Sequence, residues 1–440
     1  MSTIHKTFLP LAAVMLLMVS CGSSRRATSS RSTVPVLPES SRTVTQLNLP
    51  PQEVPIVEEV PIFVQRMDSL LLASDTLLSQ TQVGLHIVDL TTGEILYAKG
   101  EFQRMRPASS EKMVTAIAAL DILGPSYTLN TQLLTTGTIS GGTLQGDLYI
   151  KGSMDPLLST TDVTALVRQL KSLGIQRITG HIIADASFKD SDEYGWGWCW
   201  DDENPVLSPL LCGGKPGLAA SFSQALHKAG VKAGSVTNGT APSNAREIVA
   251  LRRPLTEVLQ PMMKESDNLC AEAVFYQISA RSAQQLSGKH YSRRQSISAI
   301  NDLISRANGE FPLPSLSGFA ITSTVADGSG LSLYNYQTPA TFTRLLSYAA
   351  VRPDSIYNPL LAALPIAAVD GTLKNRMAET PAAFNVRAKT GTVTAVSTLV
   401  GYATQRSTNH LIAFAIMNQG VRRSADGRAF QNKVCALISE

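Results

Sequence analysis

The sequence lacks the features that would assign it to several common classes of protein. Its 440 residues carry a formal net charge of only +4, and charged residues make up 16% of the chain. A charge this small and this dispersed argues against nucleic acid as a partner. The six histidines form no H-E-x-x-H pair and the five cysteines form no C-x-x-C pair. A zinc site therefore has no support in the sequence, and we expect no metal or cofactor.

Long hydrophobic runs are also missing, and the apolar run at residues 8–19 is short for a transmembrane helix. It follows Lys6, which is typical of a secretory signal peptide, predicted here over residues 1–20. The run leads into the segment M-V-S-C-G at 18–22, which resembles a bacterial lipoprotein signal with Cys21 as the lipidated residue. Ordinary signal-peptidase cleavage beside an incidental cysteine is the alternative.

Residues 21–60 are rich in Ser, Thr, Arg and Pro and show no sustained apolar period. Such a composition is typical of a flexible tether. If Cys21 is lipidated, the tether would hold the folded part of the chain away from a membrane surface. In an exported protein, Cys199 and Cys212 are close enough in sequence to bridge a loop, but buried free thiols are an equal alternative.

From residue 61 onward, the chain is long enough for two packed units, and 44% of all residues are hydrophobic. A helical pattern begins near residue 61. Apolar runs at 83–90 and 95–98, separated by the turn T-T-G-E, predict a β-hairpin. Apolar residues then recur at helical spacing over 110–122, which predicts a helix that begins immediately after Ser109.

The middle of the chain differs in character, and its Gly- and Thr-rich segments predict a separate α+β unit. Its predicted elements are strands within 137–149 and 178–184 and helices at 162–173 and 218–229. The remainder returns to long helices and then to antiparallel strands. We predict helices at 255–282, 296–307 and 341–350, strands at 385–389, 397–403 and 411–418, and a closing helix at 425–438.

Three short motifs occur in this order: S-S-E-K at 109–112, S-D-N at 266–268 and K-T-G-T at 389–392. Each is weak alone, because an N-capping serine with a solvated lysine, or a strand with an exposed lysine, explains it equally well. Their order and their context give them weight.

The first motif suits acyl transfer. Residues three apart on a helix share a face, so Lys112 can bring its amine to the Ser109 hydroxyl. A lysine base must be neutral, and both burial and the charge of a nearby Lys389 favour the neutral amine. The N–H groups at the helix N-terminus can stabilise negative charge that develops on a carbonyl oxygen.

The other two motifs supply further polar groups. Ser266 and Asn268 can aim a hydroxyl and an amide into one cleft, and Ser266 could relay a proton to the leaving group. Lys389, Thr390 and Gly391 are predicted on a strand, where an acyl peptide could bind by strand addition. We expect Gly391 to let the substrate backbone come close.

In this order, the motifs are the signature of serine penicillin-binding proteins and β-lactamases. The segments at 107–116, 264–272 and 327–332 resemble more narrowly the D-alanyl-D-alanine carboxypeptidase/endopeptidase family of low-molecular-mass penicillin-binding proteins (S13, the DacB type). The long stretch between the first two motifs fits that family, which has an extra domain there, whereas β-lactamases keep this stretch much shorter.

The resemblance implies an α+β fold. A β-lactamase/transpeptidase-like domain, with an antiparallel sheet between helical layers, would comprise residues 61–128 and 250–440, and an inserted α+β domain would comprise 129–249. Ser109 would attack D-Ala-D-Ala stem peptides or cross-links of peptidoglycan, water would free it, and β-lactams would acylate it. The backbone N–H groups of Ser109 and Thr392 would form the oxyanion hole. The protein would be exported to the bacterial periplasm.

Other assignments from the resemblance concern the substrate. Asp185 resembles an acidic residue that meets a free amine of the substrate, although a strand-end aspartate is the alternative. Leu333 stands where better-known members have an arginine that meets a substrate carboxylate. The segment G-W-G-W at 195–198 resembles a loop near the cleft, or else packs the insertion.

Two other functions compete with the peptidase. A β-lactamase would need a group that activates water soon after residue 268, and the sequence offers no convincing one. A catalytically inert peptidoglycan-binding lipoprotein is the second rival, but every expected catalytic side chain is present. The resemblance leaves carboxypeptidase and endopeptidase activity both open.

Overall fold

The computed structural model describes residues 60–286, 292–311 and 323–440. The predicted signal peptide, Cys21 and nearly all of the predicted tether lie outside these residues. Among the helices that are described, none combines the length and the hydropathy that crossing a bilayer requires.

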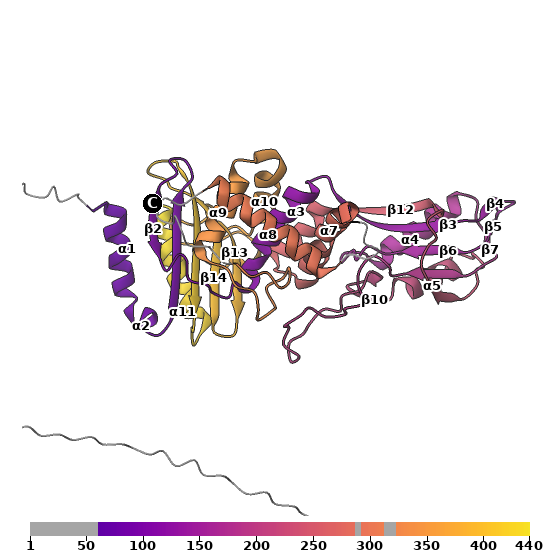
Figure 1. Cartoon of the computed structure of the whole chain (residues 1–440), viewed down its shortest axis with the longest axis horizontal. Helices are drawn as coiled ribbons and strands as arrows, with labels where there is room; N and C mark the ends of the chain where they lie inside the picture. The colour runs from indigo at the N-terminus through magenta and orange to yellow at the C-terminus, as the bar shows by residue number, and fades with distance from the viewer. Residues whose placement is uncertain (1–59, 287–291, 312–322) are drawn as a thin grey trace, which may run out of the picture. The chain divides into compact units, whose positions relative to one another are not determined.

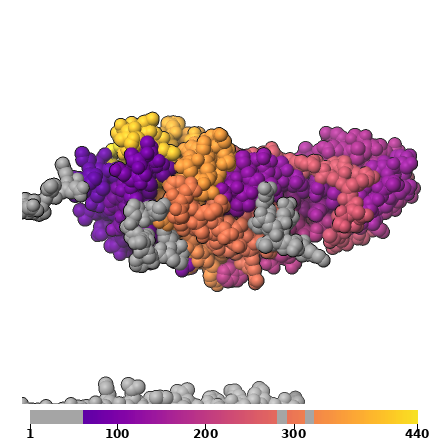
Figure 2. Space-filling model, turned by 45° about the horizontal axis from the view of Figure 1, so that its top comes forward, coloured from indigo at the N-terminus to yellow at the C-terminus, as the bar shows by residue number. Residues whose placement is uncertain are grey.

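A five-stranded antiparallel sheet forms the centre of the larger part of the protein. Its strands lie in the order β13-β14-β15-β1-β2, so the two ends of the sequence meet in its middle. The strands are β1 Gln82–Asp89, β2 Ile95–Lys99, β13 Arg387–Val393, β14 Val396–Thr404 and β15 Leu411–Gln419. Figure 2 shows the same meeting at the surface, where indigo and yellow segments lie side by side.

Both faces of this sheet are buried. Successive side chains of a strand point to opposite faces, so each strand contributes to two separate apolar cores. On β15, Ala413, Ala415 and Met417 belong to one apolar core, whereas Ile412, Phe414 and Ile416 belong to the other. The first core lies beneath helices α3, α6, α7, α8 and α9, and the second beneath α1 and α11. Figure 1 shows these two helical layers on either side of the sheet.

The helices of this part come from both ends of the chain. Those before the insertion are α1 Ile62–Ala73, α2 Asp75–Leu78, the short turn η1 Ala108–Ser110 and α3 Glu111–Leu123. Those after it are α6 Leu255–Lys264, α7 Asn268–Leu286, α8 Arg293–Glu310, α9 Pro339–Ala350, η2 Pro353–Tyr357, α10 Asn358–Ala363, η3 Gly371–Leu373 and α11 Ser424–Ile438. Helix α3 is buried on nearly all sides, which makes it a central helix of the first core.

A second five-stranded sheet, with strand order β11-β8-β6-β3-β12, lies between α3 and α6 in the chain and has its own apolar core with α4 and α5. Its strands are β3 Thr128–Thr135, β6 Leu148–Lys151, β8 Ile182–Asp185, β11 Val236–Asn238 and β12 Arg246–Pro254. The remaining elements of this region are β4 Thr138–Ser140, β5 Thr143–Gln145, α4 Thr160–Ser172, β7 Arg177–Ile178, β9 Leu211–Cys212, β10 Lys215–Pro216 and α5 Leu218–Lys228.

Several predicted elements differ from the observed ones. Strand β12 was not predicted, and it runs across the expected boundary at 249/250 while pairing with β3. The strand expected within 137–149 is three short strands, because Gly141 and Gly142 turn the chain with positive φ values of 54° and 77°. Cys199 and Cys212 are free thiols, so the structure contains no bridge between them.

The single helix predicted over 255–282 is in fact two helices, α6 and α7, interrupted at residues 265–267. Ser266 has a φ of 64°, which a continuous helix does not allow. The Asp267 carboxylate accepts a hydrogen bond from the Cys270 N–H at 2.7 Å and so caps α7. The break places the second motif at a helix start, where its side chains can leave the helix.

Candidate active site

Ser109 lies in the short turn η1 that precedes α3. Ala108 just before it has a φ of 48°, an unfavourable value for a residue with a side chain. Gly330, with a φ of 85°, has no room for a side chain because its Cα faces the Ala108 carbonyl. Ser109 remains partly exposed although both of its neighbours are buried. The turn thus presents one hydroxyl from a tightly packed surface.

Lys112 reaches three oxygen atoms at once. Its Nζ lies 3.0 Å from Ser109 Oγ and 2.7 Å from both Asn268 Oδ1 and the Ser329 carbonyl oxygen. A neutral amine has two N–H donors and one lone pair, and the two carbonyl oxygens can only accept. The lone pair therefore remains for the Ser109 hydroxyl proton. Lys112 thus joins Ser109 of the first motif to Asn268 of the second.

The third motif meets the second in the same place. Lys389 on β13 donates from Nζ to Ser266 Oγ and to the Thr390 carbonyl oxygen, each at 2.8 Å. The Lys389 side chain is fully buried. On the same edge strand, Thr390 is partly exposed and Thr392 is exposed. The structure thus brings together Ser109, Lys112, Ser266, Asn268 and Lys389.

Burial dominates the electrostatics of both lysines. It lowers the pKa of Lys112 to about 8, although the carboxylates of Asp327 and Glu272 oppose the shift. Burial, followed by repulsion from the Lys112 charge, also lowers the pKa of Lys389 well below its usual range. The expected neutral form of Lys112 is therefore favoured mainly by desolvation, which lowers the pKa of its amine.

Buried groups behind Lys112 complete the site, and sequence reasoning did not assign them roles. Asp327 accepts hydrogen bonds from the backbone N–H groups of Gly330 and Ser332 and thereby shapes the segment that carries the Ser329 carbonyl. Glu272 accepts two more N–H groups from the same segment. The signal that could have found Glu272 is a lone charge in the otherwise apolar stretch 269–275.

Gly391 has a packing role that the sequence analysis did not predict. A side chain there would meet Thr398 Oγ1 and would lie 2.5 Å from the Pro107 carbonyl oxygen and 2.9 Å from the Ser110 backbone nitrogen. The glycine therefore lets β13 pack against the turn that carries Ser109.

Replacing Gly391 tests this packing. We expect Gly391→Ala to lower the free energy of unfolding by about 1–3 kcal/mol, because backbone atoms must move to admit the methyl group. Denaturant unfolding would measure this. Gly309→Ala is the matched control, since no atom lies within 4 Å of the added methyl group, and alanine there should stabilise α8 slightly. A Gly391→Ala protein as stable as the wild type would contradict the packing role.

Asp185 is not part of this cluster. It ends β8 and is fully buried, and its two carboxylate oxygens accept hydrogen bonds from the backbone N–H groups of Ser187 and Ala241 at 2.9 Å each. These contacts fix the chain after the strand, which is the strand-end role considered as the alternative. The carboxylate is not exposed to a substrate amine.

The G-W-G-W loop lies against the segment that follows Ser329. Trp198 donates from Nε1 to the Asp327 carboxylate at 2.8 Å, and Trp196 stacks on Tyr334 with ring centroids 4.2 Å apart. Leu333, at the position of the missing arginine, donates its backbone N–H to the Gly197 carbonyl oxygen. These contacts place the loop beside residues 327–334, the segment that also supplies the Ser329 carbonyl to Lys112.

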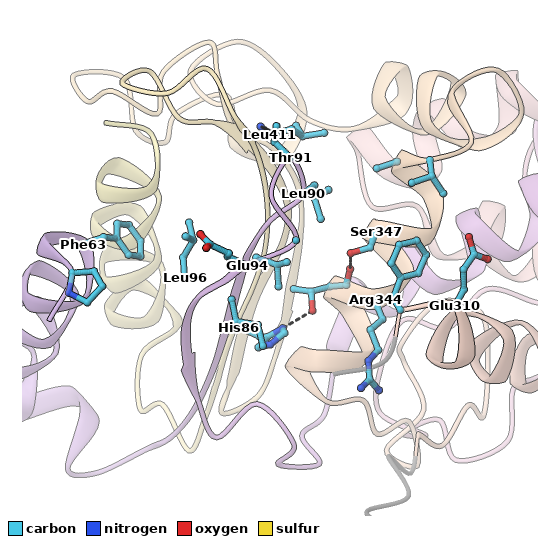
Figure 3. A pocket seen from close by; sticks show the side chains of 18 of the residues that line it. Phe63, His86, Leu90, Thr91, Glu94, Leu96, Glu310, Arg344, Ser347 and Leu411 are labelled. Atoms are coloured by element: carbon cyan, nitrogen blue, oxygen red, sulfur yellow. Dashed lines mark hydrogen bonds between the residues drawn. The ribbon is translucent and has the colours of Figure 1, made fainter. Parts of the chain in front are cut away.

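A cavity of about 1000 Å³ lies elsewhere, between the β1–β2 hairpin, the start of α1 and α9 (Figure 3). His86 faces α9 within it, with Nδ1 2.6 Å from Thr343 Oγ1, and burial lowers the pKa of His86 to about 4. None of its lining residues belongs to the three motifs. In the described ranges, no group of three or more His, Cys, Asp or Glu side chains is arranged to hold a metal ion.

Comparison with known proteins assigns the chain to a protein family. The D-Ala-D-Ala carboxypeptidase 3 (S13) family matches residues 64–210 and 215–440. The chain belongs to this family. The carboxypeptidase DacB of Mycolicibacterium smegmatis is 30% identical over 433 residues, covering 88% of this chain and 87% of that protein. The D-alanyl-D-alanine carboxypeptidase DacB of Haemophilus influenzae is 25% identical over 414 residues, covering 74% of this chain and 82% of that protein.

A solved structure supports the fold. The crystal structure of penicillin binding protein 4 (dacB) from Haemophilus influenzae superimposes with a TM-score of 0.72 and 23% identity, over 83% of this chain and 99% of that chain. These findings confirm the predicted family, the transpeptidase-like α+β fold and the enzyme class, a serine-type D-Ala-D-Ala carboxypeptidase.

Proposed function

We propose that this S13 enzyme cleaves D-Ala-D-Ala stem peptides and cross-links of peptidoglycan through an acyl-enzyme on Ser109. The observation that carries the proposal is the position of the Lys112 amine, which is held by Asn268 Oδ1 and the Ser329 carbonyl and lies 3.0 Å from Ser109 Oγ. A general base within hydrogen-bond reach of a hydroxyl is the arrangement that nucleophilic catalysis by serine requires.

In the acylation step, Ser109 Oγ attacks the carbonyl carbon of the penultimate D-Ala, and Lys112 takes the hydroxyl proton. The negative charge that develops on the carbonyl oxygen would be stabilised by the backbone N–H groups of Ser109 and Thr392. The proton passes to the departing amine as the peptide bond breaks. Water then attacks the ester, and its proton returns through the same base to restore Ser109.

Ser266 and Lys389 would serve the leaving group. Their 2.8 Å contact places a hydroxyl between the buried lysine and the cleft. Ser266 can donate a proton to the departing amine, and the Lys389 amine can donate a hydrogen bond to the terminal carboxylate of the substrate. Because β13 is an edge strand of the sheet, the acyl peptide can bind along residues 390–392 by strand addition.

β-Lactams would acylate the same serine, because they present a strained amide to the same nucleophile and a carboxylate to Lys389. The related crystal structure of penicillin binding protein 4 from Haemophilus influenzae is also known in complex with a β-lactam. We propose that β-lactams are covalent inhibitors of this enzyme.

The N-terminal sequence supports a location, and the pairing of β3 with β12 supports a domain division. We propose that residues 1–20 are a signal peptide, that Cys21 is lipidated, and that the tether to residue 60 links a periplasmic enzyme to a membrane. We further propose that the transpeptidase-like domain contains an inserted domain that begins with β3 and ends with β12, to which β3 is paired, rather than at residue 249.

Mass analysis of purified cell-wall fragments after digestion tests the proposed function. Loss of one D-Ala from pentapeptide monomers indicates carboxypeptidase activity, and conversion of dimers into monomers indicates endopeptidase activity. We expect at least one of these changes with the wild type and neither with Ser109→Ala. Unchanged fragments with folded wild-type protein, or rapid turnover of penicillin in place of a lasting acyl-enzyme, would contradict the proposal.

A further inference from the structure

Glu272 lies one helical turn after Asn268 on α7, so the two side chains share a face of the helix. Asn268 uses this face to hold the Lys112 amine at 2.7 Å. Glu272 uses it to reach the segment of residues 327–330, which supplies the other carbonyl that holds Lys112. One helix thus contacts the base directly through one side chain and indirectly through the next.

The contacts of Glu272 fix the peptide unit that directly precedes the one carrying this carbonyl. Its Oε1 accepts the backbone N–H groups of Gly328 at 3.1 Å and Ser329 at 2.9 Å. From the other side, Thr115 donates its hydroxyl to the Gly328 carbonyl oxygen at 2.8 Å. Gly328 itself leaves no room for a side chain, because a Cβ would lie 2.5 Å from Phe275 Cβ. The 328–329 peptide is therefore held from both sides, and Asp327 holds the next peptide unit, which carries the Ser329 carbonyl, through the Gly330 N–H at 2.8 Å.

The carboxyl group of Glu272 also acts on the base electrostatically, since its charge, after that of Asp327, raises the pKa of Lys112. Glu272 is only 1% exposed, so solvent screens the charge of its carboxylate little. Burial, followed by the Asp327 carboxylate, raises the pKa of Glu272 to about 8. The charged or titratable groups that face Lys112 are Glu272, Asp267 and Cys270 around the start of α7, Asp327, Lys389 on β13 and Glu111 on its own helix.

We propose that Glu272 is a positioning residue for the Lys112 base, acting through the 328–329 peptide and through the electrostatic stabilisation of the Lys112 ammonium. The inference rests on the proposed function and deepens it. When Ser109 Oγ forms its bond to the carbonyl carbon, its proton moves to Lys112 Nζ, which gains a positive charge in a fully buried place. Above about pH 8, where Glu272 is ionised, its carboxylate supplies the negative charge that stabilises this ammonium, and no further reactant is needed.

Removing the charge while keeping the shape separates these effects. In Glu272→Gln, the side-chain oxygen still accepts the two N–H groups, but the carboxylate that raises the pKa of Lys112 is gone. We expect the Lys112 pKa to fall by at least about 0.5 units. In Glu272→Asp, the charge remains and the shorter side chain loosens the peptide, so the Lys112 pKa should stay near that of the wild type.

Two readouts on the full-length protein test this. The pH titration of the lysine Cε signal by ¹³C NMR, assigned with Lys112→Arg, measures the Lys112 pKa without any substrate. The pH dependence of acylation by penicillin measures the base in action. In Glu272→Gln we expect its acid limb to move to lower pH and its plateau to fall about 10-fold, because the ammonium formed in the transition state loses a stabilising charge.

Glu257→Gln is the matched control, since Glu257 is a partly exposed carboxylate on α6 that pairs with Arg253. It should move neither readout. An unchanged Lys112 titration in Glu272→Gln would overturn the proposal, as would an equal shift in Glu257→Gln. If penicillin failed to acylate the wild type, the proposed function would fail, while the NMR titration would still decide the role of Glu272.

Discussion

Ser109→Ala should abolish the release of D-Ala from a D-Ala-D-Ala peptide, lowering the rate by about 10⁴-fold. The alanine has no nucleophile, and the neighbouring Ser110 cannot replace it because that residue is buried with its hydroxyl 2.7 Å from Thr398 Oγ1. Released D-Ala, measured with a coupled assay on purified protein, gives the rate.

The fold should survive this change. Within the described part of the chain, Ser109 Oγ hydrogen-bonds only to Lys112, and its neighbours in η1 are buried without it. The thermal unfolding midpoint should therefore stay close to that of the wild type. Ser305→Ala, which removes an exposed hydroxyl on α8, is the matched control and should keep full activity. Substantial D-Ala release by folded Ser109→Ala protein would show that another residue is the nucleophile.

Lys112→Met should lower acylation by about 10³-fold, because the variant keeps the length of the side chain but loses the base. The pH profile carries the sharper signature. Burial lowers the pKa of Lys112 to about 8, so the wild-type amine is protonated below that pH and becomes a base above it. Wild-type acylation should therefore rise with pH to a plateau above about pH 8, whereas the residual rate of Lys112→Met should show no such rise.

Lys112→Arg separates base from charge. The guanidinium can donate to Asn268 Oδ1 and the Ser329 carbonyl, yet it does not lose its proton in this pH range. It should be about as inactive as Lys112→Met. An arginine variant with near wild-type acylation would mean that position 112 supplies positive charge rather than a base.

Local patterns predicted much of the site. The helical spacing after Ser109, the hairpin before it and the strand around Lys389 all depend on residues that are near one another in sequence. Each of these elements is present in the structure, with β13 beginning at Arg387 and running on to Val393. The order of the three motifs then predicted that one site contains Ser109, Lys112, Ser266, Asn268 and Lys389.

What the sequence could not supply are contacts between distant segments. The Ser329 carbonyl that holds Lys112 comes from far along the chain. Every residue has a backbone carbonyl, so the residue types do not show which carbonyl makes the contact. The role of Gly391 likewise depends on the position of Pro107 across the site. The contact of Asp185 with the Ala241 N–H likewise joins residues that are distant in sequence.

Sheet pairing explains the missed elements of the insertion. Strand β12 carries the charged residues Arg246, Glu247, Arg252 and Arg253, which weaken its pattern as a strand. Its pairing with β3 along nearly the whole strand overrides that composition. The break between α6 and α7 was hidden because Leu, Met, Cys and Ala residues continue on both sides of residues 265–267.

The central claim is that Ser109 becomes acylated with Lys112 as its base. The most direct test treats the protein with penicillin, stops the reaction by acid and maps the adduct by mass spectrometry of its peptides. We predict one adduct per chain on the peptide that contains Ser109, formed faster as the pH rises toward 8, and absent in Ser109→Ala. An adduct on another residue, or a folded wild-type protein that carries none, would contradict the account.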